Sequence, residues 1–214
     1  MAKSLYSLML SDEVVAQIDR LAARGLTNRS NMVNQILAEY CSMVTPEKRI
    51  RNIFEEMGRL FEGDEELTAI ITPNQPTMMV KTSLAFRYRP TVRYDLRLYP
   101  AVTDGCIGEL GLSFRSQSEE LLAVTRQFFE LWAGEEAKLL RKYGPLPRYE
   151  LVPGHLGRTV RLYDESMSSE DLAEGISRYV RMLDRVLKDY CAGRMTDGDV
   201  AEVLRAWEAG RLLV

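Results

Sequence analysis

The sequence predicts an α+β protein, in which a small N-terminal module precedes an antiparallel sheet packed with helices. Three observations indicate this class. Two short helical patterns occupy the first 44 residues, four closely spaced strand-like segments come later, and long amphipathic helical patterns follow them. Runs of strands followed by helices are typical of a sheet with helices on one face. We therefore expect two domains, residues 1–44 and 45–214.

Composition and charge favour a globular cytoplasmic protein. Hydrophobic residues make up 46% of the 214 residues and charged residues 28%, which is typical of a folded chain. No apolar run approaches the ~20 residues that span a bilayer, and no secretory signal is visible. Cys41, Cys106 and Cys191 are odd in number and far apart, so we expect free thiols in a reducing compartment.

The first 40 residues predict one strand and two helices. Residues 5–10 alternate in the manner of a strand, and Ser11 is a candidate N-cap for the first helix. Gly25 ends that helix, Leu26 packs inward, and Thr27 or Asn28 caps the second helix. The apolar stripe of the first helix consists of Val14, Val15, Ile18, Leu21 and Ala22, and that of the second of Met32, Val33, Ile36, Leu37 and Tyr40.

A unit of this size encloses too little apolar surface to fold alone. The natural remedy is a dimer in which the strands of two chains pair and the four helices cover one face of the ribbon. The other face stays outside, and a two-stranded ribbon fits the major groove of DNA.

Residues 3–42, and "GLTNRSNMVNQIL" in particular, resemble the ribbon-helix-helix family, which includes the Arc, methionine and CopG-type repressors. The resemblance implies that Asn28, Arg29 and Ser30 hold a DNA phosphate at the N-terminus of the second helix. It also implies that the base-facing strand positions are Lys3, Leu5, Ser7 and Met9. The implied function is a homodimeric, sequence-specific transcriptional repressor that binds double-stranded DNA, with its own promoter as the expected target. Higher even-numbered oligomers remain open.

Two features of this segment motivate a second hypothesis. Residues 1–45 carry four basic and four acidic side chains, and Leu5 and Met9 cannot hydrogen-bond to base edges. In the alternative, the module only dimerises the protein, which acts as a protein-binding inhibitor or antitoxin-like factor of a mobile element. The second domain would then contact the protein partner.

The rest of the chain predicts the sheet and its helices. Thr45-Pro46 starts a helix that Gly63 ends. Strands are expected over 67–72, 77–88, 92–99 and 107–116, with a turn at 73–76 and breaks at Pro90 and Pro100. A helix over 118–143, a hairpin over 148–164 with its turn at Pro153-Gly154, a helix from 168 or 169 to 191 and a last helix from Thr196 complete the chain.

A basic face is the most suggestive feature of the predicted sheet. Leu84, Phe86, Tyr88 and alternate residues from Val92 to Leu98 are expected to face the helices. The opposite face then carries Lys81, Arg87, Arg89, Arg93, Arg97 and Arg115. These side chains are either an ordinary solvated face or a second surface that contacts anions, such as the DNA backbone or an acidic protein.

The remaining motifs are weak, and we expect neither an enzyme nor a cofactor. His155 is the only histidine and has no metal-ligand spacing to another His or Cys. A Cys106–His155 nucleophile pair stays a remote alternative. "GHLGR" resembles the GxxG loop of RNA-binding KH domains, but its flanks look like strands. "DGD" at 197–199 reads as a helix cap, because no further calcium ligands follow.

Overall fold

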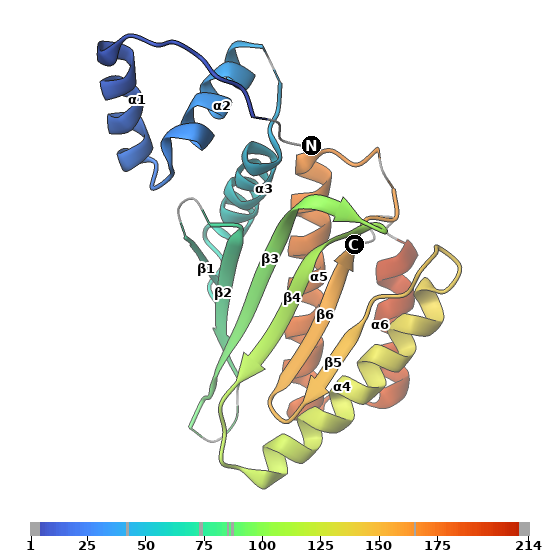
Figure 1. Ribbon diagram of the computed structural model, residues 1–214. Helices are drawn as coiled ribbons and strands as arrows, with labels where there is room; N and C mark the ends of the chain where they lie inside the picture. Colours follow the sequence, from blue (N-terminus) through green and yellow to red (C-terminus); the bar gives the residue numbers. More distant parts are fainter. Residues whose placement is uncertain are drawn as a thin grey trace.

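The computed structural model describes residues 5–41, 43–72, 75–84, 86, 88–164 and 166–209. These residues form an α+β structure of six helices and a six-stranded antiparallel sheet (Figure 1). The helices are α1 (Asp12–Arg24), α2 (Arg29–Tyr40), α3 (Pro46–Phe61), α4 (Glu119–Leu140), α5 (Ser169–Cys191) and α6 (Asp197–Ala209). The strands are β1 (Thr68–Ile71), β2 (Thr77–Ser83), β3 (Thr91–Thr103), β4 (Cys106–Phe114), β5 (Tyr149–Val152) and β6 (His155–Arg161).

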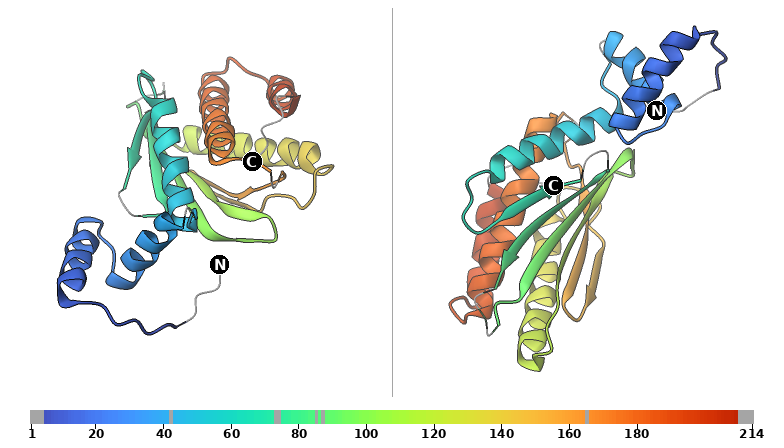
Figure 2. Two further views of the ribbon diagram at one scale, coloured as in Figure 1. Left: turned by 90° about the horizontal axis from the view of Figure 1, so that it is seen from above. Right: turned by 90° about the vertical axis from the view of Figure 1, so that its left-hand side faces the viewer.

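The sheet has helices on one face only. Its strand order is β1-β2-β3-β4-β6-β5, and every neighbouring pair is antiparallel. Helices α3, α4, α5 and α6 lie behind this sheet in the view of Figure 1, and the side view in Figure 2 shows the strands as a separate layer. The other face is open to solvent, so residues of β2, and of β3 up to Leu98, alternate between buried and more exposed positions.

The helix boundaries follow the predicted capping residues. Ser11, Thr45, Ser118 and Ser168 each accept a hydrogen bond from a backbone N–H in the first turn of the helix they precede. The predicted inward stripes of α3, α4 and α5 pack against the strands in one continuous core. Phe54, Met57, Phe128 and Trp132 are among its most buried members.

The connection between β2 and β3 differs from the predicted strands. The ladder ends at Ser83, and the N–H of Leu84 donates to Pro90 O across the loop. Tyr88 and Arg89 lie in this loop with φ of 66° and 41°, and Tyr88 is fully exposed. The prediction that Tyr88 faces the helices is therefore wrong, because period-two alternation holds only inside a strand.

The sequence predicts that a strand ends at Pro100. In the structure, Pro100 lies inside β3. The register of β3 with β2 stops at Arg97, and the N–H of Leu98 donates to Pro76 O just before β2, so the residues of β3 after Leu98 have only β4 as a neighbouring strand. The pairing with β4 is itself irregular between Leu98 and Thr103. Proline is tolerated there because its missing N–H interrupts no regular ladder.

The N-terminal segment stands apart from the sheet. Helices α1 and α2 pack on each other and project from the body above α3 (Figure 1). Residues 5–10 form no β-ladder, so the predicted strand is not seen in the single chain. A strand needs a neighbour to accept and donate its hydrogen bonds, and no described segment of the single chain pairs with residues 5–10.

The turn between α1 and α2 also differs in detail from the prediction. Leu26, not Gly25, occupies the left-handed region with φ of 46°, and its side chain is 74% exposed instead of packed inward. Two hydrogen bonds, Leu26 N–H to Ala23 O and Thr27 N–H to Ala22 O, close the helix end in a Schellman motif. Among the described residues, no helix is long and apolar enough to cross a bilayer.

Candidate nucleic-acid interface

The start of α2 is held against α1 by a bidentate ion pair. Arg29 donates from Nε and Nη2 to the two carboxylate oxygens of Asp19, each at 2.7 Å. The hydrogen bond from this guanidinium holds the pKa of Asp19 below its usual range. Arg29, a predicted phosphate contact, thus links the two helices through an exposed ion pair in the single chain, and its planar fork suits a two-point contact with a carboxylate.

The N-terminus of α2 is capped by Asn28 and presents Ser30 to solvent. Asn28 Oδ1 accepts the N–H of Asn31 at 2.9 Å, which selects Asn28 over Thr27 as the cap. Ser30, in the first turn, is exposed. Among the six helices of the described residues, α2 is the one whose first turn contains no acidic residue. This helix end therefore has no carboxylate of its own to compete with an anion for the positive end of the dipole.

The predicted base-facing residues lie on an extended, exposed segment. Leu5 and Met9 are 98% and 103% exposed, and Ser7 between them is also exposed. Lys3 lies outside the described residues. Tyr6 and Leu8 alternate with these positions and are exposed as well, so neither face of the segment is covered within one chain.

The helical pair buries few of its apolar side chains. In α2, none of the residues is buried, and in α1 only Ile18 and Ala22 are. Thirteen of the twenty exposed large hydrophobic side chains among the described residues lie between Leu5 and Val44. Large exposed apolar patches are uncommon on monomeric proteins and are a feature of interaction sites.

The structure places only part of the predicted basic set on the open face of the sheet. Lys81 and Arg93 are directly paired across β2 and β3, and Arg97 lies four residues further along β3, opposite Thr77. Arg93 donates to Asp95 at 3.0 Å on the same strand. Arg115 follows the end of β4 and is exposed. Arg87 lies outside the described residues.

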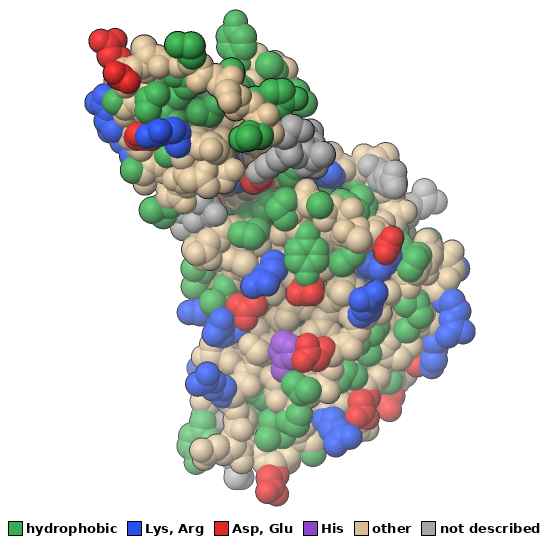
Figure 3. Space-filling view, in the orientation of Figure 1, with side chains coloured by type: hydrophobic (Ala, Val, Ile, Leu, Met, Phe, Trp, Pro, Cys, Tyr) green, Lys and Arg blue, Asp and Glu red, His purple; other side chains and the backbone are tan. Residues whose placement is uncertain are grey.

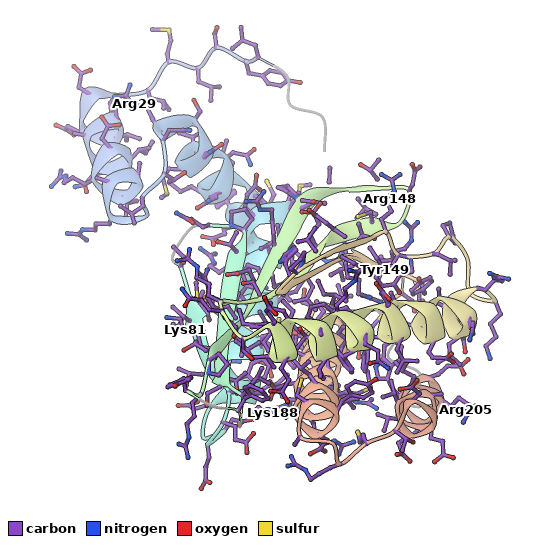
Figure 4. The ribbon with its side chains drawn as sticks, turned by 90° about the horizontal axis from the view of Figure 1, so that it is seen from below. Arg29, Lys81, Arg148, Tyr149, Lys188 and Arg205 are labelled. Atoms are coloured by element: carbon purple, nitrogen blue, oxygen red, sulfur yellow. The ribbon has the colours of Figure 1, made fainter. Side chains whose placement is uncertain are left out.

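Arg89 does not belong to this face as predicted, because it lies in the β2–β3 loop with a positive φ. The basic residues of the sheet are also remote from the helical pair. Arg29 lies on the projecting helices, apart from Lys81, in Figure 4. The two predicted anion-contacting groups therefore do not form one continuous site in a single chain.

The geometry excludes the Cys106–His155 pair. Cys106 is paired with Arg161, and His155 lies six positions earlier on β6, roughly 20 Å along the strand. His155 and Gly154 lie at a β-hairpin turn, with Gly154 at φ of 72°, so the "GHLGR" loop does not join two helices. Within the described ranges, no three His, Cys, Asp or Glu side chains are placed to hold a metal ion.

A hollow on the open face escaped the sequence analysis. It has a volume of about 650 Å³, and its charged lining includes Asp95, Arg97, Glu109, Arg148 and Glu150 beside His155. Figure 3 shows this face, with the single histidine in purple next to an acidic side chain near the centre. The available signal was the pair of glycines at outward-facing positions, Gly111 and Gly157, because glycine inside a strand often marks a place of close approach.

Comparison with known proteins gave no match to any family model, curated protein or solved structure.

Proposed function

We propose that this protein is a homodimeric DNA-binding transcriptional regulator, in which residues 5–10 of two chains pair as a β-ribbon that enters the major groove. The observation that carries the proposal is the uncovered apolar surface of α1, α2 and the extended segment before them. A second copy of the same unit supplies a matching surface and the missing strand partner. The ribbon-helix-helix arrangement would cover the apolar surface and pair the extended segment in the same dimer.

The start of α2 is the proposed phosphate contact. Its exposed Ser30, the Asn28 cap and the absence of an acidic residue from the first turn support this role. The Arg29–Asp19 ion pair supports it indirectly, because it fixes the helix end in one orientation. Phosphate contacts at both ends of the dimer position the ribbon, and the strand residues then read the bases.

The test is a fluorescence-polarisation titration with DNA from upstream of the gene and a scrambled duplex of equal length, at low and moderate salt. We expect tighter binding to the upstream DNA and weaker binding as salt rises. Ser30→Glu places a carboxylate beside the phosphate and should weaken binding by tenfold or more, since ~1.4 kcal/mol corresponds to tenfold.

Ala16→Glu is the matched control, because it adds the same charge at an exposed position of α1 opposite its apolar stripe. It should leave the affinity nearly unchanged. Equal binding to both duplexes at low salt would count against the proposal.

One observation favours a second candidate. Leu5 and Met9 are fully exposed and apolar, which suits contact with a protein as well as with thymine methyl groups. In this alternative the module dimerises a protein-binding factor. Ser30→Glu separates the two, because it should abolish DNA binding and leave co-purification of a stoichiometric protein partner intact.

A further inference from the structure

The open face of the sheet contains two adjacent glycines where side chains would be expected. Gly111 on β4 and Gly157 on β6 are directly paired, and both point to the open face. Glycine inside a strand is destabilising relative to alanine, because it loses more backbone freedom on folding and has no side chain to pack. Their pairing in the middle of the sheet removes two neighbouring side chains and forms the floor of the hollow.

Two polar side chains lie over this floor. A Cβ atom added to Gly157 would lie 3.3 Å from His155 Nε2 and 3.2 Å from Glu150 Cβ. A Cβ atom added to Gly111 would lie 3.3 Å from His155 Cε1. The glycines thus allow the imidazole and the Glu150 side chain to approach the backbone, and Glu150 Oε2 is 3.7 Å from the same position over Gly157.

The charges around the floor are separated into two ends. Asp95 and Glu150 belong to the same cross-strand row as the glycines, one on each side. The next row in the same face contains Arg97, Glu109 and Thr159, and the N–H of Thr159 donates to Arg148 O. Glu109 accepts a hydrogen bond from Tyr99, and Arg97 and Arg148 supply the positive charge at this end of the hollow. Two residues along a strand separate the rows, roughly 7 Å.

We propose that this hollow binds a small zwitterionic ligand, whose cationic group lies over Gly157 beside Glu150 and whose anionic group meets Arg97 and Arg148. The volume lies within the usual range of ligand sites, roughly 300–1,000 Å³. The distance between the two ends selects a ligand whose charges are several bonds apart, such as an ω-amino acid or a short peptide. The site makes no use of DNA, so it stands independently of the proposed regulatory function.

The single histidine provides a direct spectroscopic readout. His155 gives a single pair of imidazole signals, from Cδ2–H and Cε1–H, in a ¹H–¹³C correlation spectrum of the full-length protein at constant pH. The probe is 6-aminohexanoate, with glycine, butylamine and hexanoate as comparisons. We expect a saturable shift of the His155 signal with 6-aminohexanoate, and at least tenfold weaker binding of each comparison compound.

Two variants test the two structural elements of the site. Glu150→Gln removes the charge that meets the cation and should weaken 6-aminohexanoate binding about tenfold, whereas Glu174→Gln, an exposed position on α5, should not change it. Gly111→Val fills the floor and should abolish the saturable shift, with the fold checked by circular dichroism.

Three results would overturn the proposal. The first is the absence of a saturable shift, which would leave His155 as a side chain that merely covers two glycines. The second is equal binding of butylamine or hexanoate, which would exclude a two-ended site. The third is unchanged binding in Glu150→Gln.

Discussion

Among single residues, Glu136 and Arg158 form an ion pair that is buried between the sheet and its helices. Arg158 Nη2 lies 2.8 Å from Glu136 Oε1, and the two side chains are 1% and 0% exposed. Tyr149 and Tyr179 both donate their hydroxyl groups to Glu136 Oε2, at 2.7 and 3.1 Å. The pair joins α4, α5, β5 and β6, so its partners come from four elements.

Breaking this pair should destabilise the protein strongly. Glu136→Leu leaves the Arg158 charge buried without its carboxylate, which typically costs about 3–5 kcal/mol. Glu130→Leu is the matched control, because it removes the exposed partner of Arg126 on the same helix, and such pairs contribute about 1 kcal/mol or less. Urea denaturation of both variants measures the loss in the free energy of unfolding. Similar losses in the two variants would show that burial does not determine how much an ion pair stabilises the protein.

The thiols of Cys41 and Cys191 should differ in reactivity. Burial raises the pKa of Cys191 to about 11, while Cys41 is exposed at the end of α2. A raised thiol pKa lowers the thiolate fraction at pH 8. A rise of the pKa from 9.0 to about 11 lowers this fraction roughly 100-fold. We expect one fast-reacting thiol at position 41, assigned with Cys41→Ser, and slow labelling of Cys191 measured by mass spectrometry. Fast labelling of Cys191 in the folded protein would contradict this account.

At the scale of helices and strands, capping residues and periodicity predicted the helices after residue 44 and the antiparallel sheet, but the predicted strand over residues 5–10 is not seen. Helix starts could be predicted at Ser11, Thr45 and Ser118, because a side-chain oxygen just before an amphipathic pattern can accept a hydrogen bond from a backbone N–H of the first turn. The predictions at Pro100 and Tyr88 were wrong because they depended on where each strand ends in the sheet. Whether a proline breaks a strand depends on which neighbour needs its N–H, and that is a property of the sheet rather than of the local sequence.

The two candidate sites also differed in how far they could be predicted from the sequence. Asn28, Arg29 and Ser30 are adjacent in sequence and could be predicted as a group. The hollow could not, because Asp95, Gly111, Glu150 and Gly157 come from four strands and meet only through the register of the sheet. The partner of Arg29 was also unpredictable, since ten residues and a turn separate it from Asp19.

The capping box of α5 gives a prediction for a single element. Ser168 Oγ accepts the N–H of Asp171, and the Asp171 carboxylate accepts the N–H of Ser168. Ser168→Ala should lower the free energy of unfolding by about 1 kcal/mol. Ser169→Ala, one position inside the helix, should change it by less than about 0.5 kcal/mol. Equal effects of the two substitutions in urea denaturation would show that the cap is not the source of the loss.

For the whole molecule, the central question is what covers the apolar stripe of α2. Ile36, Leu37 and Tyr40 are 38%, 51% and 90% exposed in the single chain, although their spacing is that of a helix face that packs against a neighbour. The sheet body already has a complete core that includes α3, so it offers this stripe no counterpart among the described residues. A second copy offers the same stripe, related by twofold symmetry.

The full-length protein should therefore sediment at micromolar concentration as a dimer, at about twice the 24.4 kDa of one chain. Leu37→Glu removes two apolar side chains from each dimer, which weakens association by about 3 kcal/mol or more, or more than about 100-fold. The charge it adds to an apolar interface weakens association further. Asn34→Glu adds the same charge on the exposed, polar side of α2 and should leave the dimer intact. Because the ribbon has strand partners only in the dimer, Leu37→Glu should also lose selective DNA binding. A folded wild-type chain that sediments as a monomer would remove the basis for the ribbon and for the proposed regulatory function together.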